Sequence, residues 1–107
     1  MRAVIVTTSG VSKSNAVPMN ISSDVFSVSV AVVVSAAATY NVEHTYDDIF
    51  AAGFVQTSAT WWNNSALAAG QTTSKEAFYT SPVRAIRINQ TAGAGGTTAT
   101  IIQSGLI

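Results

Sequence analysis

A single histidine, His44, lies beside three carboxylates and is the residue best suited to acid–base or metal chemistry. Glu43 precedes it, and Asp47 and Asp48 follow it closely. In a strand, however, neighbouring side chains point to opposite faces, so His44 and Glu43 would not act together. Two adjacent carboxylates also fall short of the roughly six to eight oxygen ligands that calcium takes. We therefore expect no catalytic residue, cofactor or metal site: His44 is predicted to be a half-buried, hydrogen-bonded strand residue, and the two aspartates to shape a loop.

The run Trp61-Trp62-Asn63-Asn64 has a different potential. An exposed aromatic ring with amides beside it suits the C–H face of a sugar, and the same residue types are enriched in subunit interfaces. Adjacent residues of a strand face opposite ways, so at most one tryptophan joins the core. We expect these four residues to contact a subunit interface or a glycan, and the interface is the favoured interpretation.

Other chemistry is not indicated. The chain has no cysteine, which excludes disulfides and cysteine-based zinc sites, and its formal net charge is zero. The five basic residues are scattered along the sequence, so the clustered cations of a nucleic-acid-binding surface are missing. Arg84 and Arg87 fall on opposite sides of one expected strand. Either could form an ion pair with an acidic residue, including one of another subunit. The glycine-rich run 93–96 lacks the ending of a phosphate-binding loop and predicts a turn.

The elements that would position these residues are strands. The run 25–34 alternates, with Val28, Val30 and Val32 on one side and small or hydroxyl residues on the other, which is the two-residue period of a strand packed on one face. Similar runs are expected at 2–8, 16–21, 39–46, 76–80, 83–91 and 97–104, and Pro18 places the second of these at a sheet edge. The last two are predicted to pair as a hairpin around residues 92–96. At 47–52 we expect at most one helical turn.

About seven or eight short strands without a convincing amphipathic helix predict an all-β fold, an antiparallel β-sandwich resembling a jelly roll. A chain of 107 residues fits one domain, 1–107, within which 1–20 is either an N-terminal arm or an edge strand. Only 9% of the residues are charged, far below the usual fraction of roughly 25%, and such a surface favours association with like molecules. Val4, Ile5 and Val6 are candidates for pairing with a strand of another subunit.

The N-terminus shows no secretory signal, and no stretch is long and apolar enough to span a bilayer as a helix, so a membrane partner is not expected. We expect synthesis in a cytoplasm.

A resemblance to small virion proteins of tailed bacteriophages rests on three segments: T-Y-N-V-E-H-T-Y-D-D at 39–48, W-W-N-N at 61–64, and the ending at 81–105 with its V-R-A-I-R strand. These virion proteins resemble capsid decoration, or cement, proteins with jelly-roll folds. The resemblance implies a structural role in the virion: a dimer or trimer that binds the major capsid protein on the outside of the head, in a protein made in the bacterial cytoplasm. The alternative is a carbohydrate-binding module of a head fibre or tail tip, which would hold a surface glycan through the 61–64 cluster.

Overall fold

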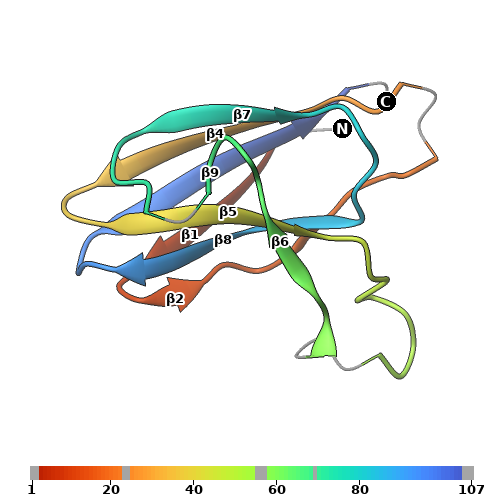
Figure 1. The fold of residues 1–107 in the computed structure, drawn as a ribbon, viewed down its shortest axis with the longest axis horizontal. Helices are drawn as coiled ribbons and strands as arrows, with labels where there is room; N and C mark the ends of the chain where they lie inside the picture. The colour runs from red at the N-terminus through yellow and green to blue at the C-terminus, as the bar shows by residue number, and fades with distance from the viewer. Residues whose placement is uncertain (1–2, 23–24, 55–57, 69, 105–107) are drawn as a thin grey trace.

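A computed structural model describes residues 3–22, 25–54, 58–68 and 70–104 of the chain. The described residues form strands and turns, arranged as two antiparallel sheets packed face to face (Figure 1). Sheet A has the order β1-β9-β4-β7, and sheet B the order β2-β8-β5-β6 with β3 also on β8. The strands are β1 (Val4–Ser9), β2 (Ser12–Lys13), β3 (Val17–Pro18), β4 (Val28–Ser35), β5 (Thr39–Thr45), β6 (Trp61–Asn63), β7 (Lys75–Tyr79), β8 (Ala85–Ala92) and β9 (Gly96–Gln103). The predicted all-β sandwich is confirmed.

The order of the strands is that of a jelly roll. Strands β2 and β3 pair with successive parts of β8 and together act as one interrupted strand. Counted so, the first strand pairs with the last, the second with the last but one, and so on inward, always antiparallel, to the pair of β5 and β6. This nested pairing wraps the chain into two four-stranded sheets, as in a jelly roll of eight strands.

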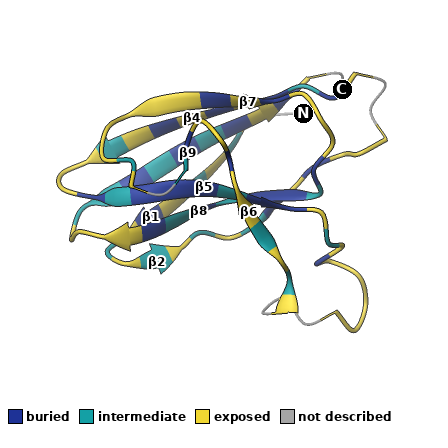
Figure 2. Ribbon diagram, viewed as in Figure 1, coloured by how far each residue is buried: buried dark blue, intermediate teal, exposed yellow. Residues whose placement is uncertain are grey.

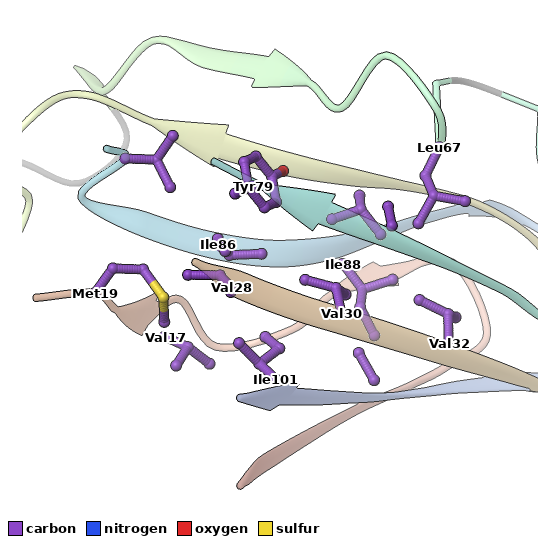
Figure 3. Close-up of a cluster of buried hydrophobic side chains, with 14 of the residues drawn as sticks. Val17, Met19, Val28, Val30, Val32, Leu67, Tyr79, Ile86, Ile88 and Ile101 are labelled. Carbon is purple, nitrogen blue, oxygen red and sulfur yellow. The ribbon is translucent and has the colours of Figure 1, made fainter. Parts of the chain in front are cut away.

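The core lies between the two sheets and follows the alternation read from the sequence. Val28, Val30 and Val32 of β4 are buried, whereas Ser29 and Ala31 are exposed (Figure 2). Figure 3 shows these valines directed at side chains of the opposite sheet, among them Ile86 and Ile88 of β8. The core cluster is Val17, Met19, Phe26, Val28, Val30, Val32, Tyr40, Val42, Leu67, Ala77, Tyr79, Val83, Ile86, Ile88, Ala99 and Ile101. Burial of this apolar surface is the main favourable term in folding.

The predicted hairpin of the last two strands is wrong. Strand β8 belongs to sheet B and β9 to sheet A, so residues 92–96 cross between the sheets. The buried amide of Gln90 explains the crossing, because its Nε2 donates to the carbonyls of Gly93 and Gly95 at 3.1 and 2.9 Å. Gly93 has a φ of 91°, and a Cβ there would lie 2.4 Å from the Ala37 carbonyl oxygen. The glycines therefore permit a tight crossing rather than a two-stranded turn.

The N-terminal segment is an edge strand and not a projecting arm. Strand β1 pairs with β9 over its whole length, from Val4 opposite Ile101 to Ser9 opposite Gly96. Its hydroxyl residue Thr8 is buried and donates to Gln90 Oε1 at 2.8 Å, which ties the strand to sheet B. The edge position expected for Pro18 is confirmed, since β3 contacts β8 at the rim of sheet B.

The connection from β5 to β6 projects away from the sheets (Figure 1). Residues 47–52 contain only turns, in line with the prediction, with Ile49 N–H donating to the Asp47 carbonyl at 3.0 Å. Residues 55–57 of this connection lie outside the described residues, and the strand that follows it is β6.

Candidate functional site

A hollow of about 250 Å³ opens between the end of β6 and the end of β7, at one side of the sandwich. Its lining comes from the end of β5, from the last residue of β6 and the two that follow it, from β7, and from the connection into β8. The jelly-roll order places β6 and β7 at the rims of the two sheets, so the hollow lies where the sandwich is open.

The inner wall of the hollow is a hydrogen-bonded set of three side chains. His44 Nδ1 lies 3.0 Å from the hydroxyl of Tyr79, and both side chains are buried. Their rings meet edge to face with centroids 5.0 Å apart. Asn64, also buried, hydrogen-bonds to the same Tyr79 hydroxyl. Figure 3 shows the Tyr79 ring between β7 and β5, where it links the two sheets.

The hydrogen bonds of Asn64 fix the orientation of its amide. Its Oδ1 accepts from the backbone N–H groups of Ala66 and Leu67 at 2.9 and 3.2 Å, which leaves its Nδ2 to donate to Tyr79. Tyr79 and His44 Nδ1 share the next hydrogen bond, in which either atom is the donor according to the tautomer of the histidine.

Burial keeps this wall uncharged. Desolvation lowers the pKa of His44 below its ordinary value of 6.5. Desolvation also raises the pKa of Tyr79 from 10.0 to about 12, and the hydrogen bond from Asn64 offsets only part of that effect. At neutral pH both groups are neutral. The prediction that His44 is a hydrogen-bonded strand residue is confirmed, although it is buried rather than half-buried.

The set does not include Glu43, the carboxylate next to His44 in the sequence. Glu43 lies on the other face of β5, opposite Arg87 of β8, as the alternation predicts. Its Oε1 accepts from Arg87 Nε at 2.8 Å. Within the described residues no group of three or more histidine or acidic side chains is placed to hold a metal ion.

Toward solvent, the hollow is bordered by exposed rings and free hydroxyls. The side chains of Tyr46 and Phe78 line it and are more than half exposed. The hydroxyls of Ser65, Thr80 and Ser81 line it too. None of these three hydroxyls has a hydrogen-bond partner among the described residues, so they are available to a ligand or to water.

The 61–64 cluster is divided between two faces of the sheet. Trp62 pairs with His44 and is exposed, whereas Trp61 pairs with Thr45 and lies half-buried on the outer face. Asn63 lines the hollow and also accepts from Asn41 at 2.6 Å. The two tryptophans therefore do not form one flat platform, and neither belongs to the core cluster.

The outer face of sheet B carries an ordered polar network. The guanidinium of Arg87 lies over the Trp61 ring, with 3.8 Å from Cζ to the ring centroid. The other carboxylate oxygen of Glu43 accepts from Asn41 and Asn89, each at 3.2 Å. These contacts join side chains of β5, β6 and β8, so the network is suited to holding the three strands together.

The remaining charged candidates also have partners within the chain. Asp47 Oδ2 accepts from the backbone N–H of Thr60 at 2.8 Å and closes the projecting loop, as predicted. Asp48 lies 3.7 Å from Arg84, and both side chains are largely exposed. The two arginines that were available for an inter-subunit acid are therefore paired with acids of their own chain.

The outer face of sheet A is broad and almost uncharged. Cross-strand pairing sets its side chains in rows, such as Ile5 and Thr100 beside Ala31, and Ile102 beside Ser29 and Phe78. Large apolar side chains are exposed on all four strands, namely Ile5, Val33, Phe78 and Ile102. Among the described strand residues of this face, Glu76 is the one charged side chain.

Comparisons with protein families, with curated proteins and with solved structures find no match to this chain. The described residues include no apolar helix of bilayer-spanning length.

Sequence reasoning missed Tyr46, Phe78 and Tyr79 as residues of the hollow. The sequence contains only a weak indication for Phe78 and Tyr79. They are adjacent aromatic residues in a short expected strand, and the alternation of a strand buries one of them and exposes the other. Their meeting with His44 and Asn64 depends on the pairing of strands far apart in the sequence, which the local pattern does not contain.

Proposed function

We propose that this protein is a structural component of a bacteriophage virion that binds the outside of the head as a capsid decoration protein. The observation that carries the proposal is the outer face of sheet A, with exposed apolar side chains on four neighbouring strands and one carboxylate. Exposed apolar surface of this kind marks protein–protein contacts. The choice of a phage head as the partner rests on the resemblance read from the sequence of segments 39–48, 61–64 and 81–105.

A neutral face suits a capsid partner because little charge has to be desolvated on docking. Burying an unpaired charge costs far more than burying a hydroxyl that finds a partner. The polar residues of this face are mostly serine and threonine, such as Ser29, Thr98 and Thr100, which can exchange water for backbone acceptors. The apolar side chains that lie between these hydroxyl residues supply the favourable free energy of binding.

Strand β1 offers a second contact to a neighbouring copy. It is the terminal strand of sheet A, so one side of its backbone faces away from the sheet. Val4, Ile5 and Val6 are the residues through which an edge strand of another subunit would add. Such pairing would build the dimer or trimer that decorates the shell.

The test is binding to undecorated heads. Purified protein is mixed with heads that lack it, and the bound fraction and the heat resistance of the particles are measured. We expect saturable binding and raised heat resistance for the native protein. Val33→Glu adds a carboxylate on the exposed side of β4, an inner strand of sheet A, and should weaken binding by roughly tenfold or more.

Val11→Glu is the matched control, because Val11 is equally exposed but lies outside the strands of sheet A. It should bind as the native protein does. Absence of binding by the native protein, or equal binding by both variants, would overturn the proposal.

A further inference from the structure

We propose that the hollow between β6 and β7 binds one neutral sugar ring. The hollow shares Phe78 with the edge of the outer face of sheet A and is otherwise a separate surface, so the proposal does not depend on capsid binding. It is carried by three features of the hollow: a rigid inner wall, an aromatic border and a set of unused hydroxyls.

The inner wall is fixed before any ligand arrives. Tyr79 is held by Asn64 on one side and by His44 on the other, and Asn64 is itself held by two backbone N–H groups. These side chains are buried and have little freedom to rearrange. A preformed wall lowers the ordering cost of binding.

The border supplies the aromatic surface that a sugar requires. The Tyr46 ring meets the His44 ring edge to face, with centroids 5.5 Å apart, and so is held upright at the rim while remaining more than half exposed. Phe78 exposes its ring at the opposite strand. Ring faces of this kind complement the C–H face of a pyranose.

The polar groups of the hollow match a polyhydroxylated and uncharged molecule. Ser65, Thr80 and Ser81 each offer a hydroxyl that donates and accepts, without a partner in the described part of the chain. Among the described residues that line the hollow there is no lysine, arginine, aspartate or glutamate, and the histidine is neutral at pH 7. A phosphate or carboxylate ligand would find no counter-charge here.

The size limits the ligand to a single ring. About 250 Å³ is below the roughly 300–1,000 Å³ of pockets that hold drug-sized molecules. A small, open hollow of this kind predicts affinity on the order of millimolar for a free monosaccharide. Binding to a surface glycan would gain strength from several copies on one particle.

The experiment is a titration of ¹⁵N-labelled protein with glucose, galactose, mannose and N-acetylglucosamine, followed by amide chemical shifts. At least one sugar should give saturable shifts confined to the amides of residues 44–46, 63–65 and 78–83. Tyr46→Ala should weaken that binding by roughly fivefold or more, since it removes one border ring. Phe50→Ala, an exposed ring on the projecting loop, is the matched control and should bind normally.

Three results would overturn the proposal: no saturable shift with any of the four sugars, the same shifts with glycerol, or tighter binding of glucuronate than of glucose. Loss of sugar binding in Trp62→Ala together with normal binding in Tyr46→Ala would show that the sugar binds at the exposed tryptophan. That result would also overturn the proposal. Val33→Glu should bind sugar normally, which separates this surface from the capsid-binding face. A fold check by circular dichroism on each variant excludes unfolding as the cause.

Discussion

Replacing Tyr79 with phenylalanine removes one hydroxyl and leaves two buried groups without a partner. Asn64 loses the partner of its amide, and His44 loses the partner of its Nδ1. An unsatisfied buried polar group costs about 1–3 kcal/mol. Because the hollow lets water reach one side of the set, we expect the free energy of unfolding to fall by about 2 kcal/mol near pH 7.

The same variant should change the response to alkali. The Tyr79 phenol has a pKa of about 12 in the folded chain and 10.0 when unfolded, so its contribution to stability is complete below pH 10 and is lost as the pH rises toward 12. That difference corresponds to roughly 3 kcal/mol. The native protein should therefore lose this stability above pH 10, whereas Tyr79→Phe should not, and the two stability curves should converge.

The assay is urea unfolding followed by circular dichroism at a series of pH values. Tyr40, whose pKa burial also raises, affects both proteins in the same direction and cancels in their difference. Tyr46→Phe is the control, because its ring is exposed, and it should cost no more than about 0.5 kcal/mol. A gap between native protein and Tyr79→Phe that stays constant from neutral to alkaline pH would refute the hydrogen-bonded arrangement of the wall.

Three further outcomes are expected in urea unfolding. Because burial lowers the pKa of His44, the free energy of unfolding should fall as the pH drops below 6.5, where the histidine binds a proton more readily in the unfolded chain than in the folded one. His44→Gln should lack this fall. An acid response in His44→Gln equal to that of the native protein would contradict the prediction. Ile101→Ala should cost about 2–5 kcal/mol, whereas Ile102→Ala, its exposed neighbour, should cost far less; equal losses would disprove the assigned faces of β9. Gln90→Met should cost about 3 kcal/mol by freeing the carbonyls at the sheet crossing, and stability like that of the native protein would show that the amide does not hold it.

The fold class was readable from the sequence because its signal is local. Alternation at Val28, Val30 and Val32 fixes which face of β4 is buried, and the structure confirms it. The crossing at 92–96 was not readable, because a glycine-rich run permits both a hairpin and a passage between sheets. The choice depends on Gln90, a single buried amide whose acceptors lie further along the chain.

The candidate site was only partly readable for a related reason. The separation of His44 from Glu43 follows from the strand period and was predicted. The meeting of His44 with Tyr79 and Asn64 was not, since it requires the pairing of β4 with β7 and the turn after β6. The two-residue alternation of a strand shows which face of the sheet a side chain occupies. It does not show which distant strand packs against that face.

The central place of β9 in sheet A has a consequence for biosynthesis. Strand β9 lies between β1 and β4, so the earliest strand has no lateral partner in its own sheet until residues 96–103 have left the ribosome. The strand that joins β1 to β4 is therefore synthesised after every other strand of this sheet. Until then, β1 and the facing edge of β4 have unpaired backbone donors and acceptors. Strand pairing between segments so far apart in the sequence is slow to form. A nascent chain of this kind therefore depends on rapid completion of its synthesis, or on a chaperone, to avoid aggregation.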